Sequence, residues 1–216
     1  MNLQMNLQKR ASFIQKKLKA LYPDPKPPLS HDDAFTLLVA VMLSAQTTDA
    51  MVNQVTPSLF KLANTPEKMA NLTSAEILKH IRRCNYSPTK SRNLKKLSEK
   101  IMSEFHGIVP SSEEALESLP GIGHKTASVV LSQIFGVATF PVDTHIHRLA
   151  KRWGLSSGKS VEQTESDLKA IFPKKTWNAL HLQIIFYGRE YCSARGCDGT
   201  KCLICSVLLV GASRDC

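Results

Sequence analysis

The sequence lacks any hydrophobic stretch long enough to cross a membrane. Its longest apolar runs, near Leu37–Leu43 and Leu203–Val210, fall well short of the roughly 18–20 residues that a spanning helix needs. The first eight residues, Met-Asn-Leu-Gln-Met-Asn-Leu-Gln, are polar where a secretory signal has an apolar centre. These absences argue against a membrane or secreted protein, and we expect a cytoplasmic one.

Acidic and aromatic residues are both scarce. The chain has 18 Asp and Glu against 28 Lys and Arg, which gives a formal net charge of +10. Such a charge attracts polyanions, although it also serves solubility alone. An anionic membrane surface is the weaker alternative, since no segment shows a basic amphipathic stripe with aromatic anchors. With only 6% aromatic residues, aliphatic helix packing is favoured over a sheet sandwich.

Cysteine is nearly absent until the end of the chain. Cys84 stands alone, and the other five of the six cysteines fall within residues 192–216. A secreted disulfide scaffold would spread its cysteines through the sequence. The distribution therefore favours a reducing compartment and a local cluster of thiols.

Strand-like alternation is also missing, and helix signals replace it. Apolar residues recur at helical spacing at Leu94, Leu97 and Ile101. Pro57 predicts a kink or an end in one helix. Helix starts are predicted by Thr65-Pro66-Glu67 and by three capping-box spacings: Thr73…Glu76, Ser111…Glu114 and Ser160…Gln163. The fold class predicted is all-α.

The strongest local pattern is Leu-Pro-Gly-Ile-Gly-His-Lys-Thr-Ala at residues 119–127. Gly121 and Gly123 allow a tight turn with exposed backbone, and Ile122 is expected to fill the space between the two flanking helices. The amides that follow would point outward at a helix N-terminus, where an anion is favoured. In so basic a chain the anion expected is a nucleic-acid phosphate, although an ordinary helix–turn–helix connection is the alternative.

This segment resembles the helix-hairpin-helix motif of the endonuclease III family. Two more segments match the family in order, Leu-Ser-Ala-Gln-Thr-Thr-Asp at residues 43–49 and Val-Asp-Thr-His-Ile at residues 142–146. The similarity runs from about Phe35 to Cys205. It implies an enzyme that removes oxidised pyrimidines from duplex DNA and cleaves abasic sites, so the partner expected is double-stranded DNA carrying such lesions. We expect a monomer associated with the nucleoid in a cell without a nucleus.

Lys125 and Asp143 are the two residues to which the resemblance assigns the chemistry. Lys125 lies in the first turn of the helix after the hairpin, where the positive end of the helix dipole favours a neutral amine. The family implies that this amine attacks C1′ and forms a Schiff base, followed by β-elimination. An electrostatic phosphate contact is the alternative. Asp143 fits a helix N-cap, and the resemblance adds a role in stabilising charge that develops on the deoxyribose.

Glycosylases lift the target base from the stack, and a side chain then fills the gap. The resemblance assigns that insertion to Gln46, whose alternative is an ordinary polar residue at a helix end. The residues predicted to contact DNA are Gln46, Gly121, Ile122, Gly123, His124 and Thr144.

The C-terminal cysteines have metal-ligand spacing. Cys202-Leu-Ile-Cys205 suits either zinc or an iron–sulfur cluster. The segment before Cys192 resembles the approach to the family's first [4Fe-4S] ligand, which implies Cys192, Cys202, Cys205 and Cys216 as ligands, with Cys197 as the alternative. The spacing departs from the family's, so the fourth ligand stays open, and zinc is the second choice of metal.

A stiff linker follows a predicted helix over residues 5–21 and contains Pro23, Pro25, Pro27 and Pro28. The helical pattern pauses again at Gly136–Pro141. With the resemblance, we expect a helical barrel domain over residues 27–137 that bears the hairpin. Residues 1–26 and 138–216 would form a second helical domain with the metal loop, and DNA would lie in a groove between the domains.

Two other functions remain possible. The adenine-mismatch glycosylase branch carries a glutamate where this chain has Ala40, and it lacks the hairpin lysine. A non-catalytic helix-hairpin-helix DNA-binding protein would need neither Lys125 nor Asp143.

Overall fold

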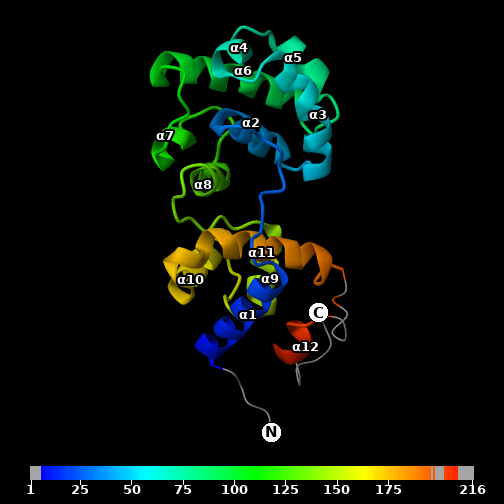
Figure 1. Ribbon diagram of the computed structural model, residues 1–216, viewed down its shortest axis with the longest axis vertical. Coiled ribbons are helices and arrows are strands. Elements are labelled where there is room, and N and C mark those ends of the chain that lie inside the picture. Colours follow the sequence, from blue (N-terminus) through cyan, green and yellow to red (C-terminus); the bar gives the residue numbers. More distant parts are fainter. Residues whose placement is uncertain (1–5, 196, 198–201, 209–216) are drawn as a thin grey trace. The chain divides into compact units, whose positions relative to one another are not determined.

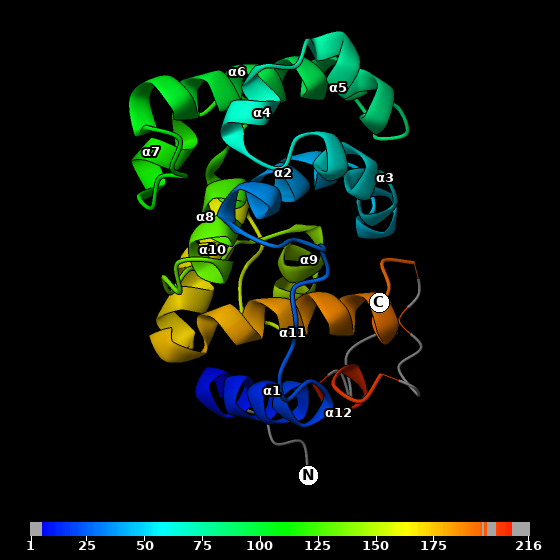
Figure 2. The same cartoon turned by 45° about the horizontal axis from the view of Figure 1, so that its top comes forward.

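Helices make up all the regular structure of the described residues, which are 6–195, 197 and 202–208 of the computed structural model. No strand occurs in this part of the chain (Figures 1 and 2). The prediction of an all-α fold is therefore confirmed. The chain divides into two units: Pro27–Val137, which we name the hairpin unit, and Met1–Lys26 with Ala138–Cys216, which we name the cysteine unit.

The hairpin unit is built around one apolar helix, α2 (Ala34–Ser44), in which every residue from Phe35 to Leu43 is buried. The apolar run Leu37–Leu43 noted in the sequence thus lies in the hydrophobic core of the hairpin unit. The remaining helices of the unit are α3 (Asp49–Leu62), α4 (Pro66–Ala70), α5 (Ser74–Ile81), α6 (Ser87–Phe105), α7 (Glu113–Glu117) and α8 (His124–Gln133). Pro57 lies inside α3 and does not end it.

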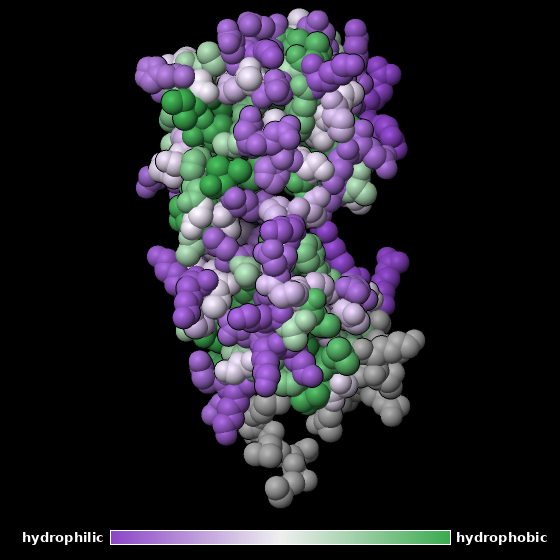
Figure 3. All heavy atoms as spheres, viewed as in Figure 1, coloured by the Kyte–Doolittle hydropathy of each residue, from purple (hydrophilic) through white to green (hydrophobic). Residues whose placement is uncertain are grey.

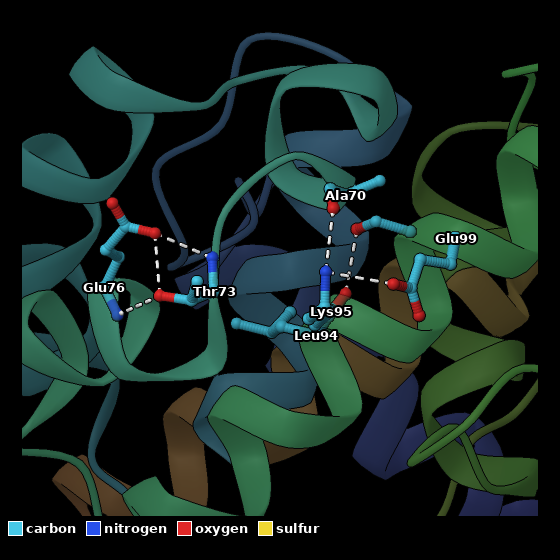
Figure 4. A network of polar contacts seen from close by, with 7 residues as sticks. Ala70, Thr73, Glu76, Leu94, Lys95 and Glu99 are labelled. Atoms are coloured by element: carbon cyan, nitrogen blue, oxygen red, sulfur yellow. Dashed lines mark hydrogen bonds and ion pairs between the residues drawn. The ribbon is translucent and has the colours of Figure 1, made fainter.

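Capping side chains fix most helix starts, and two local predictions need correction. The Thr73–Glu76 capping box forms as expected: the Thr73 amide donates to Glu76 Oε2 (2.7 Å), and the Glu76 amide donates to Thr73 Oγ1 (3.2 Å) (Figure 4). Thr65 and Ser160 are N-caps, but Ser160 caps without the reciprocal bond of a box. The predicted Ser111…Glu114 box was wrong, because Ser112 caps α7 instead.

A lysine of α6 links this helix to the end of α4. Lys95 Nζ donates to the carbonyl oxygen of Ala70 (3.0 Å), at the end of α4, and forms an ion pair with Glu99 (2.9 Å). Figure 4 shows this contact beside the Thr73–Glu76 capping box. The bond satisfies one of the carbonyls that the end of a helix leaves without a partner.

The cysteine unit combines the two ends of the described chain. Its helices are α1 (Leu7–Leu21), α9 (Thr144–Arg152), α10 (Val161–Ile171), the 3₁₀ turn η1 (Lys174–Thr176), α11 (Trp177–Glu190) and α12 (Cys205–Leu208). Arg10 Nη1 donates to the carbonyl oxygen of Trp153 (2.8 Å), and Gln183 Nε2 donates to that of Tyr22 (2.8 Å). Trp153 is fully buried. The N-terminal helix is therefore part of this core.

Each unit has its own hydrophobic core, and polar residues cover most of the face shown in Figure 3. None of the described helices is both long and apolar enough to cross a bilayer.

Candidate nucleic-acid interface and metal centre

The hairpin between α7 and α8 has the geometry that its glycines predict. Gly121 adopts a left-handed conformation (φ +83°), and a Cβ placed on it would lie 2.7 Å from Nδ2 of Asn93 in α6. The Ile122 amide donates to the carbonyl oxygen of Leu119 (3.1 Å), which closes the turn. The position therefore requires glycine for both its backbone conformation and its close approach to α6.

Ile122 packs into the core of the hairpin unit, with 6% of its surface exposed. The side chain is therefore buried at the turn, as the prediction that it packs beside the flanking helices requires. Gly123 is exposed and is the N-cap of α8, where it provides no capping side chain. The start of α8 thus presents backbone N–H groups and the positive end of the helix dipole on the surface, which suits a phosphate oxygen.

Lys125 is the second residue of α8, and its side chain is exposed. Among the described residues no ion pair or hydrogen bond restrains its amine, whereas the side chain of its neighbour His124 contacts α7. His124 Nδ1 lies 2.8 Å from Glu113 Oε1 and 2.9 Å from Glu117 Oε1. Of the two side chains at the start of α8, Lys125 is thus the one available for a reaction, while any contact of His124 with DNA stays a prediction.

Gln46 lies in the short connection between α2 and α3. It is exposed and has a left-handed backbone conformation (φ +55°), which is uncommon for a residue other than glycine. Asn85 Nδ2 donates to the Gln46 carbonyl oxygen, and the Asn85 amide donates to Thr47 Oγ1 (3.1 Å). The connection is therefore held by a segment almost 40 residues further along the chain.

Asp143 is the N-cap of α9, and its carboxylate accepts a hydrogen bond from the Ile146 amide (2.8 Å). This confirms the capping interpretation, and its catalytic role stays a prediction. Thr144, the first residue of α9, is exposed. Burial lowers the pKa of His145, although the nearby charge of Asp143 opposes that shift. His145 is therefore neutral over a wider pH range than an exposed histidine.

Four buried cysteines meet at one point of the cysteine unit. The sulfur atoms of Cys192, Cys197, Cys202 and Cys205 all lie within 4.8 Å of one another, and none of them forms a disulfide. The sequence interpretation preferred Cys216 as the fourth ligand, with Cys197 as the alternative. Here the structure favours Cys197, and Cys216 lies outside the described residues.

The surroundings of the sulfur atoms suit a thiolate centre. Arg152 Nη1 donates to Cys192 Sγ (3.0 Å), and Tyr187 Oη lies 3.1 Å from Cys202 Sγ. Hydrogen bonds from Cys192 and Cys205 lower the pKa of Cys202, whereas burial raises the pKa of Cys197 to about 12. Four thiolates buried this close together would repel one another and lose hydration, a cost that a bound metal cation would offset. The donor set therefore fits a metal centre.

Three residues around this centre were missed by the sequence interpretation. Arg152 is 40 residues from Cys192 in the sequence, and Tyr187 accepts a hydrogen bond from the Ile204 amide (3.0 Å) while touching Cys202. Arg148 Nη2 also donates to the Cys192 carbonyl oxygen (2.8 Å). The sequence offered one indication that the two arginines act together: they lie four residues apart, which places both on the same face of α9.

Comparison with known proteins agrees with these features. Residues 39–174 match the HhH-GPD superfamily of base excision DNA repair proteins. The chain is 44% identical over 191 residues to Endonuclease III of Treponema pallidum (strain Nichols), covering 88% of this chain and 90% of that protein. It is 38% identical over 208 residues to Endonuclease III of Bacillus subtilis (strain 168), covering 96% and 95%.

Solved structures give the same result. The chain resembles a trapped covalent intermediate of Endonuclease III with DNA, with a TM-score of 0.88 and 37% identity over 93% of this chain and 94% of that one. It also resembles a non-covalent Endonuclease III–DNA complex, with a TM-score of 0.90 and 36% identity over 94% and 96%.

Proposed function

Because this chain belongs to the HhH-GPD superfamily of base excision DNA repair proteins, we propose that it is a bifunctional DNA glycosylase and abasic-site lyase. Its substrate would be duplex DNA that carries oxidised pyrimidines or abasic sites. The observation that supports this most is the exposed Lys125 amine in the first turn of α8, directly after the glycine hairpin. A relative with 37% identity was trapped as a covalent intermediate with DNA, and such a trap requires a protein nucleophile.

Lys125 would act through the lone pair of its neutral amine. Nζ attacks C1′ of the damaged nucleotide, and the bond from C1′ to the base breaks, with the electron pair leaving on the base. Opening of the sugar ring then gives a Schiff base between Nζ and C1′. Loss of a proton from C2′ expels the 3′ phosphate, which cleaves the strand, and water finally releases the lysine.

Asp143 would supply the carboxylate for this reaction. Its cap bond to the Ile146 amide occupies Oδ1 and fixes the orientation of the side chain. The negative charge would stabilise the positive charge that develops on the deoxyribose as the base departs. Capping and catalysis are compatible, because a carboxylate has two oxygens and accepts several hydrogen bonds.

The contacts with DNA would divide into two kinds. The N-terminus of α8, with the backbone around Gly121 and Gly123, would bind a phosphate and position the duplex without reading its sequence. His124 would contribute to this backbone contact, and Thr144 of the cysteine unit would also contact DNA. Gln46 would fill the space left in the base stack when the damaged nucleotide turns outward.

The metal centre would be a [4Fe-4S] cluster held by Cys192, Cys197, Cys202 and Cys205. The choice of iron over zinc rests on the family resemblance, and Cys197 as fourth ligand rests on the geometry of the described residues. The cluster would have a structural role, fixing the basic loop around Arg195. No step of the reaction requires it.

Borohydride trapping tests the proposed nucleophile. Borohydride reduces a Schiff base to a stable amine, so the wild-type protein with a duplex that contains one oxidised pyrimidine should give a covalent adduct on a denaturing gel. Lys125→Gln should give none. Lys96→Gln, which removes another exposed lysine of the hairpin unit, should trap like the wild type. An undiminished adduct with Lys125→Gln would reject the assignment.

A further inference from the structure

Lys90 is buried in the hairpin unit although lysine is rarely buried. It lies in α6, and only 6% of its surface is exposed. Its ammonium group donates three hydrogen bonds: to the carbonyl oxygens of Leu43 (2.7 Å) and Ala45 (2.7 Å), and to Oγ1 of Thr47 (3.0 Å). An ammonium group has three donors, so its hydrogen-bonding capacity is filled.

All three acceptors belong to the end of α2 and the connection that follows it. Helix C-termini leave carbonyls without partners and carry a partial negative charge, which a cation stabilises. The last turn of α2 contains no basic residue of its own. Lys90 therefore provides, from 43 to 47 positions further along the chain, the cation that caps this helix.

The hydrogen bonds of Lys90 reach the residues on both sides of Gln46 in the sequence. They reach Ala45 on one side of it and Thr47 on the other, while Asn85 Nδ2 donates to the carbonyl of Gln46 itself. The left-handed conformation of Gln46 costs free energy in any residue other than glycine. Contacts on both sides of the residue offset that cost and hold its backbone in this conformation.

Packing alone does not explain a lysine at this position. Burial lowers the pKa of Lys90, so the ammonium form is disfavoured and is retained through its acceptors. A methionine has a similar length and would fill the same space without any desolvation cost. A methionine, however, cannot donate hydrogen bonds to the three oxygens that Lys90 contacts near Gln46.

We propose that Lys90 is a positioning residue that fixes the connection Ala45–Thr47, so that Gln46 is presented for insertion into the DNA duplex. This inference rests on the proposed function, in which Gln46 fills the gap in the base stack. Lys90 would touch no part of the substrate and would act only through the backbone and side chain of this connection.

The test is a double-mutant cycle on duplex substrate with Lys90→Met, Gln46→Ala and the double variant. A misplaced insertion residue should reduce kcat/KM by about 10- to 100-fold, since a displacement near 1 Å can cost 100-fold. Both single variants should show this loss, and the double variant should be no slower than Gln46→Ala, because the two changes remove the same contribution. Cleavage of a single-stranded abasic substrate, which has no opposing strand to fill, should stay near the wild-type rate.

Lys95→Met is the matched control. Lys95 lies in the same helix and also caps a helix end, through the Ala70 carbonyl oxygen (Figure 4). That oxygen belongs to α4 and not to the connection that contains Gln46. It should leave duplex activity within about twofold of the wild type, as surface changes away from a site generally do. Should Lys90→Met fail to fold, Thr47→Val, which removes one acceptor, should show the same selective loss on duplex substrate.

Independent, multiplying losses in the cycle would overturn the proposal, as would an equal loss on single-stranded and duplex substrate. If Gln46→Ala alone retains wild-type activity, then both the insertion role of Gln46 and the role of Lys90 fail. The borohydride result with Lys125→Gln is unaffected by that outcome, so the two proposals fail separately.

Discussion

Replacing Gly121 with alanine should destabilise the protein by an amount that the hairpin geometry determines. The left-handed conformation at φ +83° would cost an alanine about 1–2 kcal/mol. Its Cβ would lie 2.7 Å from Asn93 Nδ2, and overpacking of this kind adds about 1–3 kcal/mol. Alanine also lowers the conformational entropy of the unfolded chain, which stabilises the folded protein by about 0.4–1 kcal/mol. We therefore expect a net loss of about 1–5 kcal/mol.

Urea unfolding measures this loss. With an m-value of about 2 kcal/mol/M, the midpoint should fall by about 0.5–2.5 M. Gly123→Ala is the control from the same turn: its Cβ would meet no atom within 4 Å, and its φ is −107°. Because the better N-cap property of glycine and the entropy gain of alanine nearly cancel there, we expect a change within about 1 kcal/mol.

Combining Gly121→Ala with Asn93→Ala separates the two contributions. Removing Nδ2 and Cγ of Asn93 relieves the closest contact but leaves its Cβ 3.1 Å away and the backbone strain unchanged. The double variant should therefore recover part of the loss and never all of it. Equal effects of alanine at Gly121 and Gly123 would refute this account of the turn.

Two further predictions concern the cysteine unit. The purified Cys197→Ser variant should lose most of its iron and acid-labile sulfide, whereas Cys216→Ser should keep both. Metal analysis and visible absorbance measure these contents. The reverse result would make Cys216 the fourth ligand. Burial lowers the pKa of His145, whose imidazole also interacts with the charges of Asp143, Arg148 and Arg189. The unfolded chain therefore takes up a proton at this histidine at a higher pH than the folded protein does. Stability should therefore fall as the pH drops below the ordinary histidine value of about 6.5, and unfolding curves of His145→Asn should show a smaller fall; an unchanged pH dependence would contradict the assignment.

The local features of this protein were predictable from its sequence because they depend on residues three or four positions apart. The Thr73–Glu76 capping box and the N-cap of Asp143 are such contacts. The hairpin glycines were equally clear. Where the local prediction was wrong, at Ser111, two adjacent serines offered the same chemistry, and the register of the helix decided in favour of Ser112.

The fourth ligand of the metal centre could not be chosen in this way. Spacing left Cys197 and Cys216 as alternatives, because a loop of either length can return a thiol to the other three. Only the packing of the described residues brings Cys197 within reach of Cys192, Cys202 and Cys205.

The sequence by itself determined that the chain is helical, that a glycine hairpin precedes Lys125, and that cysteines gather at the C-terminal end. These properties follow from periodicity, capping chemistry and composition, which are local. The tertiary structure decided that Lys90 donates hydrogen bonds to the residues beside Gln46 and that Arg152 donates one to Cys192 Sγ, across separations of about 40 residues. Such pairs leave no local pattern, because their energy comes from burial and hydrogen bonding that exist only once the helices have packed.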